Sequence, residues 1–216
     1  MSYQLLQKVS RRNFIKGASL FAVAAPALYG CAGALALKEG QEQTGKIIAT
    51  NQGWMGAAAA PRNPSSKIKI VSESEPGEPL IISGTIYSLK DSKPIEGITL
   101  FVYHTDARGL YNNEGNSRAA GPRLHGWMKT KADGRYEFRT IKPASYPNSD
   151  IPMHIHATVF DANRPEYWID SYWFEGDPFL TPKQLAQLSG RGGGNSIVSL
   201  KRDEQGVLRG VRDLRV

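Results

Sequence analysis

The chain has 216 residues, of which 40% are hydrophobic, with a formal net charge of +7 and a single cysteine. Four of the 27 lysines and arginines and none of the 20 acidic residues lie in residues 1–31, so the rest of the chain carries a net charge of only +3. Such a small surplus argues against a nucleic-acid-binding protein, and one cysteine excludes a scaffold held by internal disulfides. Four arginines near the C-terminus are interpreted as a solvated strand face: Arg202, Arg209, Arg212 and Arg215.

Residues 1–31 have the order of features found in an export signal. They contain a close match to the twin-arginine motif, SRRNFIK at 10–16, followed by an apolar stretch from Gly17 to Gly30. That stretch is shorter than the roughly twenty apolar residues that a membrane-spanning helix needs. A basic amphipathic N-terminus of a cytosolic protein is the alternative. The order of features predicts export through the twin-arginine machinery, and therefore a periplasmic or cell-surface location.

The apolar stretch ends at a short motif that resembles a bacterial lipobox, LYGC at residues 28–31. In such a motif the cysteine becomes the first residue after cleavage and carries a lipid, which would anchor the protein to a membrane through Cys31. Tyr29 is unusual inside a lipobox, so ordinary signal-peptidase cleavage nearby is the competing interpretation.

The residues between this signal and the first predicted strand, 32–67, lack a sustained apolar period. They include AAAA at 57–60 and PRNPSS at 61–66, a composition typical of a flexible linker. Residues 68–216 are numerous enough for one domain with a hydrophobic core. The sequence therefore predicts a signal peptide at 1–31, a linker at 32–67 and one domain at 68–216.

From residue 68 onward, short segments rich in β-branched and aromatic residues alternate with turn signals. One short helix is predicted, with Thr181 as N-cap, Pro182 at its first position and its end at Leu188. Strands at this spacing predict an all-β fold, a β-sandwich with one short helix and long loops. The predicted strands are 68–71, 80–87, 98–103, 136–138, 155–160, 167–174, 197–200 and 207–211.

Two tyrosines and two histidines form the most informative candidate site. His154 and His156 are two residues apart at the start of a predicted strand, so both side chains can project from one face and reach one ion. Tyr111 and Tyr146 would add phenolate oxygens, which an oxidised hard cation favours, and this ligand set suits few metals other than ferric iron. Taken alone, a His-x-His pair on a strand is more often structural than metal-binding.

The sequence around these four residues resembles that of the intradiol ring-cleavage dioxygenases, the catechol and protocatechuate enzymes. The resemblance runs from about Pro79 to Pro178 and is densest in DGRYEFRTIKP at 133–143, with further matches in YHTDARGLY at 103–111 and LHGW at 124–127. It implies the β-sandwich of that family's catalytic domain. It also implies a non-haem ferric ion, Fe(3+), whose ligands would be Tyr111, Tyr146, His154 and His156.

The activity implied by the resemblance is oxidative cleavage of a catecholic ring by O2, between its two hydroxylated carbons. Tyr146 would be the ligand that substrate displaces, and it would act as a base as it leaves. Better-known members carry an arginine and a glutamine where this chain has Ile151 and Ser171, a difference that metal binding tolerates better than ring cleavage does. His125 could substitute as a polar catalytic group in the pocket, or could be a turn residue that faces solvent.

Two other functions are compatible with the sequence. Residues 82–86 and 93–102 also look like the start of a transthyretin-like or carboxypeptidase-regulatory sandwich, a binding module without metal. Such a module has no need of two tyrosines and two histidines as ligands. Ile151 and Ser171 would also suit a ferric protein that binds a catecholate without cleaving it. The pattern leaves the particular aromatic substrate and the oligomeric state open.

Overall fold

The computed structural model describes residues 46–114, 117–193 and 195–216, all of which belong to one compact unit spanning residues 42–216. The twin-arginine motif, the lipobox and Cys31 lie outside the described residues, so their roles stay predictions. Within the described ranges, no helix has the length and the apolar character needed to cross a membrane.

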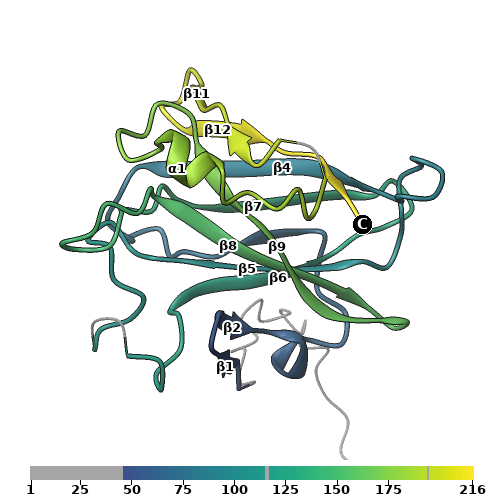
Figure 1. Cartoon of the computed structure of the whole chain (residues 1–216). Coiled ribbons are helices and arrows are strands. Elements are labelled where there is room, and N and C mark those ends of the chain that lie inside the picture. Colours follow the sequence, from purple (N-terminus) through teal and green to yellow (C-terminus); the bar gives the residue numbers. More distant parts are fainter. Residues whose placement is uncertain (1–45, 115–116, 194) are drawn as a thin grey trace, which may run out of the picture. The chain divides into compact units, whose positions relative to one another are not determined.

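Two β-sheets face each other, and a small two-stranded hairpin lies against one of them (Figure 1). The first sheet has five strands in the order β10-β9-β8-β5-β6, and the second has six in the order β11-β12-β4-β7-β3, with β13 beside β4. The elements are β1 Ile48–Thr50, β2 Gly53–Met55, the 3-10 helix η1 Ala57–Ala59, β3 Lys67–Lys69, β4 Pro79–Tyr87, β5 Thr99–His104, β6 Leu124–Lys129, β7 Arg135–Ile141, β8 His154–Asp161, β9 Arg164–Phe174, α1 Pro182–Leu185, β10 Ile197–Val198, β11 Lys201–Arg202, β12 Leu208–Val211 and β13 Leu214–Arg215.

The hydrophobic core lies between the two sheets and follows from the alternation of side chains along each strand. In β8, Ile155 and Ala157 are fully buried in this core. His154 and His156 alternate with them and therefore point to the outer face of the five-stranded sheet. The fully buried core residues from the second sheet include Leu80, Ile82, Ile86 and Phe138.

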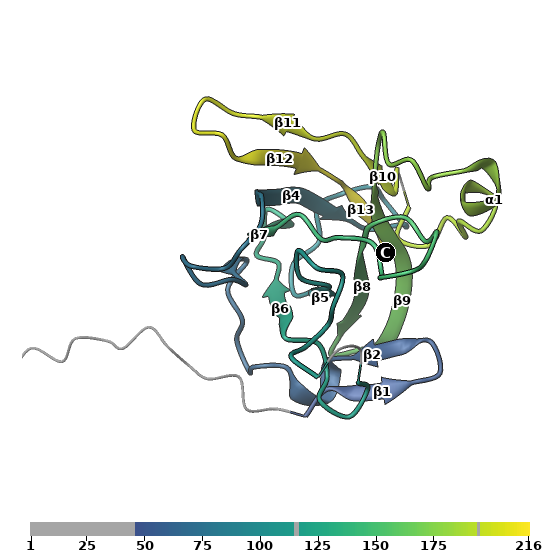
Figure 2. The same ribbon diagram turned by 90° about the vertical axis from the view of Figure 1, so that its left-hand side faces the viewer.

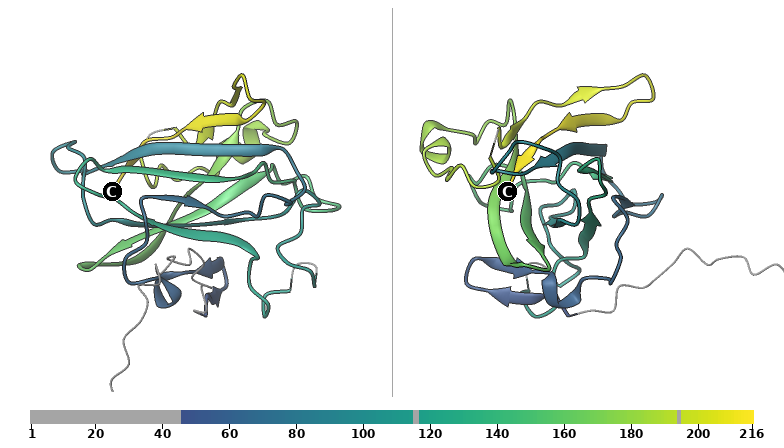
Figure 3. Two further views of the ribbon diagram at one scale, coloured as in Figure 1. Left: turned by 180° about the vertical axis from the view of Figure 1, so that it is seen from behind. Right: turned by 90° about the vertical axis from the view of Figure 1, so that its right-hand side faces the viewer.

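A second cluster, made of aromatic side chains, covers the outer face of the five-stranded sheet. Strand β5 is buried along its whole length. Leu100 and Val102 face the core, whereas Phe101 and Tyr103 face outward, toward the hairpin of β1 and β2. Trp54 of β2 is 4% exposed and packs edge-on against Tyr103, with 5.5 Å between the ring centroids. Figures 2 and 3 show the hairpin on this outer side, away from the six-stranded sheet.

Residues 46–67 therefore differ from the flexible linker that the sequence leads us to expect, because they form β1, β2, η1 and the first residue of β3. One reason is the carboxylate of Glu166 on β9, which accepts hydrogen bonds from the backbone N–H groups of Gly56 and Ala57, each at 2.7 Å. The other is the burial of Trp54. Residues 32–45 of the predicted linker lie outside the described residues.

The predicted all-β sandwich with one short helix is confirmed, although some elements differ from the prediction. Helix α1 ends at Leu185 rather than Leu188. The sequence does not indicate β6, because His125 and Gly126 interrupt its apolar residues and leave no period-two pattern. Arg212 is not part of a solvated face: it is 2% exposed, and its guanidinium lies 4.4 Å from the centre of the Tyr172 ring.

Candidate metal centre

Strand β8 brings two histidines to one point on the outer face of the sheet. His154 and His156 are separated only by Ile155, whose side chain is buried in the core. Both imidazoles project from the opposite face, and their Nε2 atoms lie 3.0 Å apart. Both histidines thus lie on a strand and project from the same face, as the His-x-His pattern predicts.

The two tyrosines come from separate loops that lie against each other. Gly109, with a φ of +81°, lets the loop after β5 approach the loop after β7 very closely. A Cβ atom at this position would collide with the carbonyl oxygen of Ser145. The close approach places Tyr111 beside Tyr146, and their hydroxyl groups are hydrogen-bonded to each other.

The four predicted ligand atoms converge. His156 Nε2 lies 2.9 Å from Tyr111 Oη and 3.2 Å from Tyr146 Oη. His154 Nε2 lies 3.1 Å from Tyr146 Oη. Two atoms bound at about 2.1 Å to one ion, at right angles to each other, would lie about 3 Å apart. The spacing of the two imidazole nitrogens from each other and from the neighbouring phenol oxygens is therefore the spacing expected for ligands of a single ion.

The Nδ1 atom of each histidine, which faces away from the tyrosines, also has a hydrogen-bond partner. His154 Nδ1 donates to the carbonyl oxygen of Pro152 at 2.6 Å, which leaves the lone pair of Nε2 facing the tyrosines. His156 Nδ1 lies 3.3 Å from Ser171 Oγ on β9, and in the same tautomer it donates to that hydroxyl. Both histidines are thus oriented to bind through Nε2 as neutral imidazoles.

The surroundings favour the neutral form of all four side chains. Burial raises the pKa of Tyr111 and Tyr146, and the neighbouring Tyr146 raises the pKa of Tyr111 further. Burial also lowers the pKa of His154, and it lowers the pKa of His156 well below its usual value, with His154 adding to the second shift. Phenolate anions would therefore need a cation at this point to balance their charge.

A hollow of about 310 Å³ is lined by three of the four candidate ligands, Tyr111, Tyr146 and His156. Trp54 packs edge-on against Tyr111 with 4.8 Å between centroids, and Tyr103 stacks on His156 at 4.7 Å. All four of these residues line the hollow, together with Arg118. Aromatic walls with a few polar groups suit a flat aromatic ligand.

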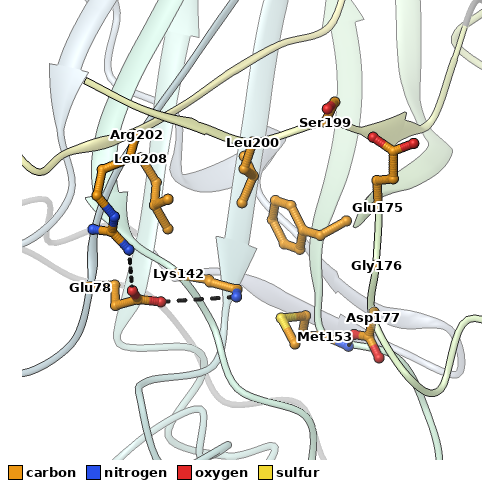
Figure 4. A pocket seen from close by; sticks show the side chains of 11 residues that line it. Glu78, Lys142, Met153, Glu175, Gly176, Asp177, Ser199, Leu200, Arg202 and Leu208 are labelled. Atoms are coloured by element: carbon orange, nitrogen blue, oxygen red, sulfur yellow. Dashed lines mark hydrogen bonds and ion pairs between the residues drawn. The ribbon is translucent and has the colours of Figure 1, made fainter.

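A second hollow, of about 320 Å³, is lined by none of the four candidate ligands. Figure 4 shows that Glu78 binds two cations there, Arg202 at 2.6 Å and Lys142 at 3.9 Å. On its wall, the carboxylate of Asp177 accepts a hydrogen bond from the backbone N–H of Met153 at 2.8 Å. This bond holds the backbone of the residue that precedes His154.

His125 does not join the cluster, although the sequence suggests it as a catalytic group. It lies on β6, which β5 separates from β8, and its ring packs against Trp127 with 5.1 Å between centroids. Its Nδ1 donates to the carbonyl oxygen of Pro122 at 2.6 Å. His125 lines a different hollow, beside Lys46, and not the one next to the four ligands.

Two residues that shape the site escape the sequence prediction, Trp54 and Arg118, which line the hollow. A tryptophan inside a predicted linker is the one signal that could have revealed Trp54. Arg118 gives no local pattern, because its role depends on contacts between distant segments. Ser171, which the sequence marks only as a replacement for glutamine, contacts His156 through its hydroxyl.

The donor set fits a hard, oxidised cation. Two phenol oxygens and two imidazole nitrogens point at one place, and phenolate oxygen is the kind of ligand that such a cation prefers. In the part of the chain that the structure describes, no three or more His, Cys, Asp and Glu side chains come together into a metal site of another kind. The residues present thus fit the ferric ion that the resemblance implies, and its binding would release the two phenol protons.

Comparisons with known proteins show which family the chain resembles. A family model described as dioxygenase matches residues 55–204. Catechol 1,2-dioxygenase 1 of Acinetobacter lwoffii is 30% identical over 141 residues, which cover 57% of this chain and 44% of that protein. The protocatechuate 3,4-dioxygenase beta chain of Burkholderia cepacia is 31% identical over 127 residues, 54% of each protein. The solved dioxygenase domain of a carbohydrate-binding fusion protein from Streptomyces sp. SirexAA-E has a TM-score of 0.55 and 26% identity, covering 72% of this chain and 90% of that one.

The match over residues 55–204 includes all four candidate ligands and most strands of both sheets. The chain therefore belongs to the intradiol ring-cleavage dioxygenase family. It spans about half the length of the curated relatives it matches. Gln52 and Trp54, which line the hollow, precede the matched region.

Proposed function

We propose that this protein holds one ferric ion and cleaves a catecholic ring between its two hydroxylated carbons with O2. The proposal is carried by the convergence of two phenol oxygens and two imidazole nitrogens, with 2.9–3.2 Å between each imidazole nitrogen and its neighbouring donor atoms. When bound, ferric iron would supply the Lewis-acid and redox chemistry that lets an electron-rich catecholate react with dioxygen. Membership of the intradiol family supports the same reaction.

The two tyrosines differ in how firmly they are held, which supports different roles for them. Tyr111 is 7% exposed and packs against Trp54 and Tyr103, as suits a permanent ligand. Tyr146 is half-buried in the loop between β7 and β8, as suits a ligand that can be exchanged. In the proposed reaction, a catechol hydroxyl transfers its proton to Tyr146 Oη while this tyrosine gives up its place to the substrate.

The hollow would orient the substrate ring. If the two catechol oxygens lie next to the four ligands, the substrate ring would occupy the hollow of about 310 Å³. The walls of this hollow include Trp54 and Tyr103. Their aromatic surfaces would fix the plane of the ring and exclude water from the reacting carbons. The wall thus contributes to positioning, while the ligands contribute the chemistry.

Oxygen uptake and product spectra with a panel of catechols test this activity. Iron-loaded protein should consume O2 in equal amount to the catechol and form a muconate-type diacid, detected by its ultraviolet absorption. Tyr146→Phe should lower kcat by about 100-fold or more, because phenylalanine cannot accept the proton. Tyr87→Phe on β4 should keep wild-type activity. Consumption of catechol without ring-opened product would contradict the proposal.

A second candidate function is catecholate binding without cleavage. It is favoured by Ile151, an apolar side chain that is 45% exposed at a place where better-known members carry arginine. In the same uptake experiment, this function would give a colour change on mixing and no oxygen consumption. A preparation that resists iron loading would instead favour the metal-free binding module.

We also propose that the protein is exported by the twin-arginine machinery and anchored to a membrane through Cys31. The support is the sequence alone, SRRNFIK at 10–16 and LYGC at 28–31. Replacing Arg11 and Arg12 with lysine should retain the protein in the cytoplasm. Cys31→Ser should move it from the membrane fraction to the soluble fraction, and an unchanged distribution would contradict the lipid anchor.

A further inference from the structure

The hollow beside the metal centre has a marked charge asymmetry. Of the described residues that line it, Arg118 is the one cation, and none is an acid. Gln52, from the hairpin of β1 and β2, adds an uncharged amide. An anionic group that enters this space would therefore meet a guanidinium and no carboxylate that repels it.

Arg118 forms two hydrogen bonds with the hairpin, one as donor and one as acceptor. Its Nη1 donates to the carbonyl oxygen of Thr50. In return, its own carbonyl oxygen accepts a hydrogen bond from Trp54 Nε1 at 3.1 Å. The loop that carries Arg118 and the hairpin thus build one wall of the hollow together, and the position of the guanidinium is set by that wall.

The charge of Arg118 is available to a ligand. Its side chain is exposed, and no ion pair joins it to an acid among the residues that the structure describes. A guanidinium has five N–H donors, so it can bind a carboxylate while one donor stays on Thr50.

We propose that the substrate is a catechol with an anionic substituent, such as a ring carboxylate, and that Arg118 selects it. The proposal rests on the proposed function, because the four ligands fix where the two catechol oxygens lie. The far edge of the ring then extends into the hollow, toward the wall that Arg118 and the hairpin share. A neutral catechol fits the same space but gains nothing from the guanidinium.

The test uses two compounds of nearly equal shape, 3,4-dihydroxybenzoate and 3,4-dihydroxybenzamide, which differ in charge. On the iron-loaded protein, kcat/KM is measured for each by oxygen uptake. On the same protein without oxygen, Kd is measured for each by titration calorimetry. The variants are Arg118→Gln, which removes the charge, and Arg118→Lys, which keeps it, with Arg135→Gln, at an exposed position of β7, as a matched control.

Wild-type protein should prefer the benzoate by about tenfold in Kd and in kcat/KM, and added salt should reduce this preference. Arg118→Gln should abolish the preference by raising KM and Kd for the benzoate alone. Arg118→Lys should retain part of it, and Arg135→Gln all of it.

An equal loss for benzoate and benzamide in Arg118→Gln would overturn the proposal, because it would show that Arg118 only holds the hairpin. Equal use of both compounds by wild-type protein would overturn it as well. If neither compound is cleaved, the proposed ring cleavage fails, whereas the ratio of the two Kd values still decides whether Arg118 selects for charge.

Discussion

His156 is oriented by a hydroxyl on the neighbouring strand, since its Nδ1 lies 3.3 Å from Ser171 Oγ. Partners of this kind fix the ring and its tautomer, and their loss typically costs about 10- to 100-fold in metal affinity. We expect Ser171→Ala to lose iron to a chelator about tenfold faster than wild-type protein. Ser199→Ala, at an exposed serine, is the control. Equal rates in the two variants would show that Ser171 does not support the ligand.

His104 is the most deeply buried histidine and takes no part in the cluster. Its Nδ1 lies 2.7 Å from the carbonyl oxygen of Thr105, and its Nε2 lies 2.7 Å from Thr140 Oγ1 on β7. Burial lowers the pKa of His104 from 6.5 to about 4. Between these pH values the unfolded chain binds a proton that folded His104 does not, so stability falls as the pH falls from 6.5 to about 4.

We therefore expect the free energy of unfolding of metal-free wild-type protein to drop more steeply with acidification than that of His104→Gln. Across that window the difference between the two proteins should reach up to about 3 kcal/mol. Urea denaturation at several pH values measures it. Parallel curves for the two proteins would mean that His104 does not titrate differently in the folded and unfolded states.

At the scale of elements, one carboxylate holds the backbone directly after the hairpin of β1 and β2. Glu166 accepts hydrogen bonds from Gly56 and Ala57 and from the hydroxyl of Thr158. Hydrogen bonds to a charged group are worth about 1.5–3 kcal/mol. We expect Glu166→Gln to raise amide hydrogen exchange in residues 53–57 by about tenfold or more, with β4 and β7 unaffected. Glu175→Gln should change nothing, and a uniform rise across the chain would indicate global destabilisation instead.

An element can be predicted from the sequence when its own residues determine it, and not when contacts with distant residues do. Strand β8 follows from its own alternation, so both its position and the direction of His154 and His156 could be predicted. The family motifs around the four candidate ligands are what makes them predictable as a set. The hairpin could not be predicted, because β1 and β2 have three residues each, and the segment is held by distant contacts such as that of Gly56 with Glu166, 110 positions away. The position of Arg118 likewise depends on that hairpin.

At the scale of the whole molecule, the sandwich holds three separate segments in fixed positions relative to one another. The strand that bears the histidines belongs to the five-stranded sheet, while Tyr111 and Tyr146 lie on loops that follow β5 and β7, one strand from each sheet. The packed core between the sheets thus fixes the distance between the two loops. The two sheets thus bring the four candidate ligands together at one edge of the sandwich.

Metal analysis combined with visible spectroscopy tests the central claim most directly. The purified, folded protein should contain about one iron per chain and show a tyrosinate-to-iron charge-transfer band, as expected for phenolate ligands on ferric iron. The double variant Tyr111→Phe/Tyr146→Phe should stay folded by circular dichroism and lose both the band and most of the iron. Wild-type protein that takes up no iron, or a double variant that keeps the iron and the colour, would contradict the account.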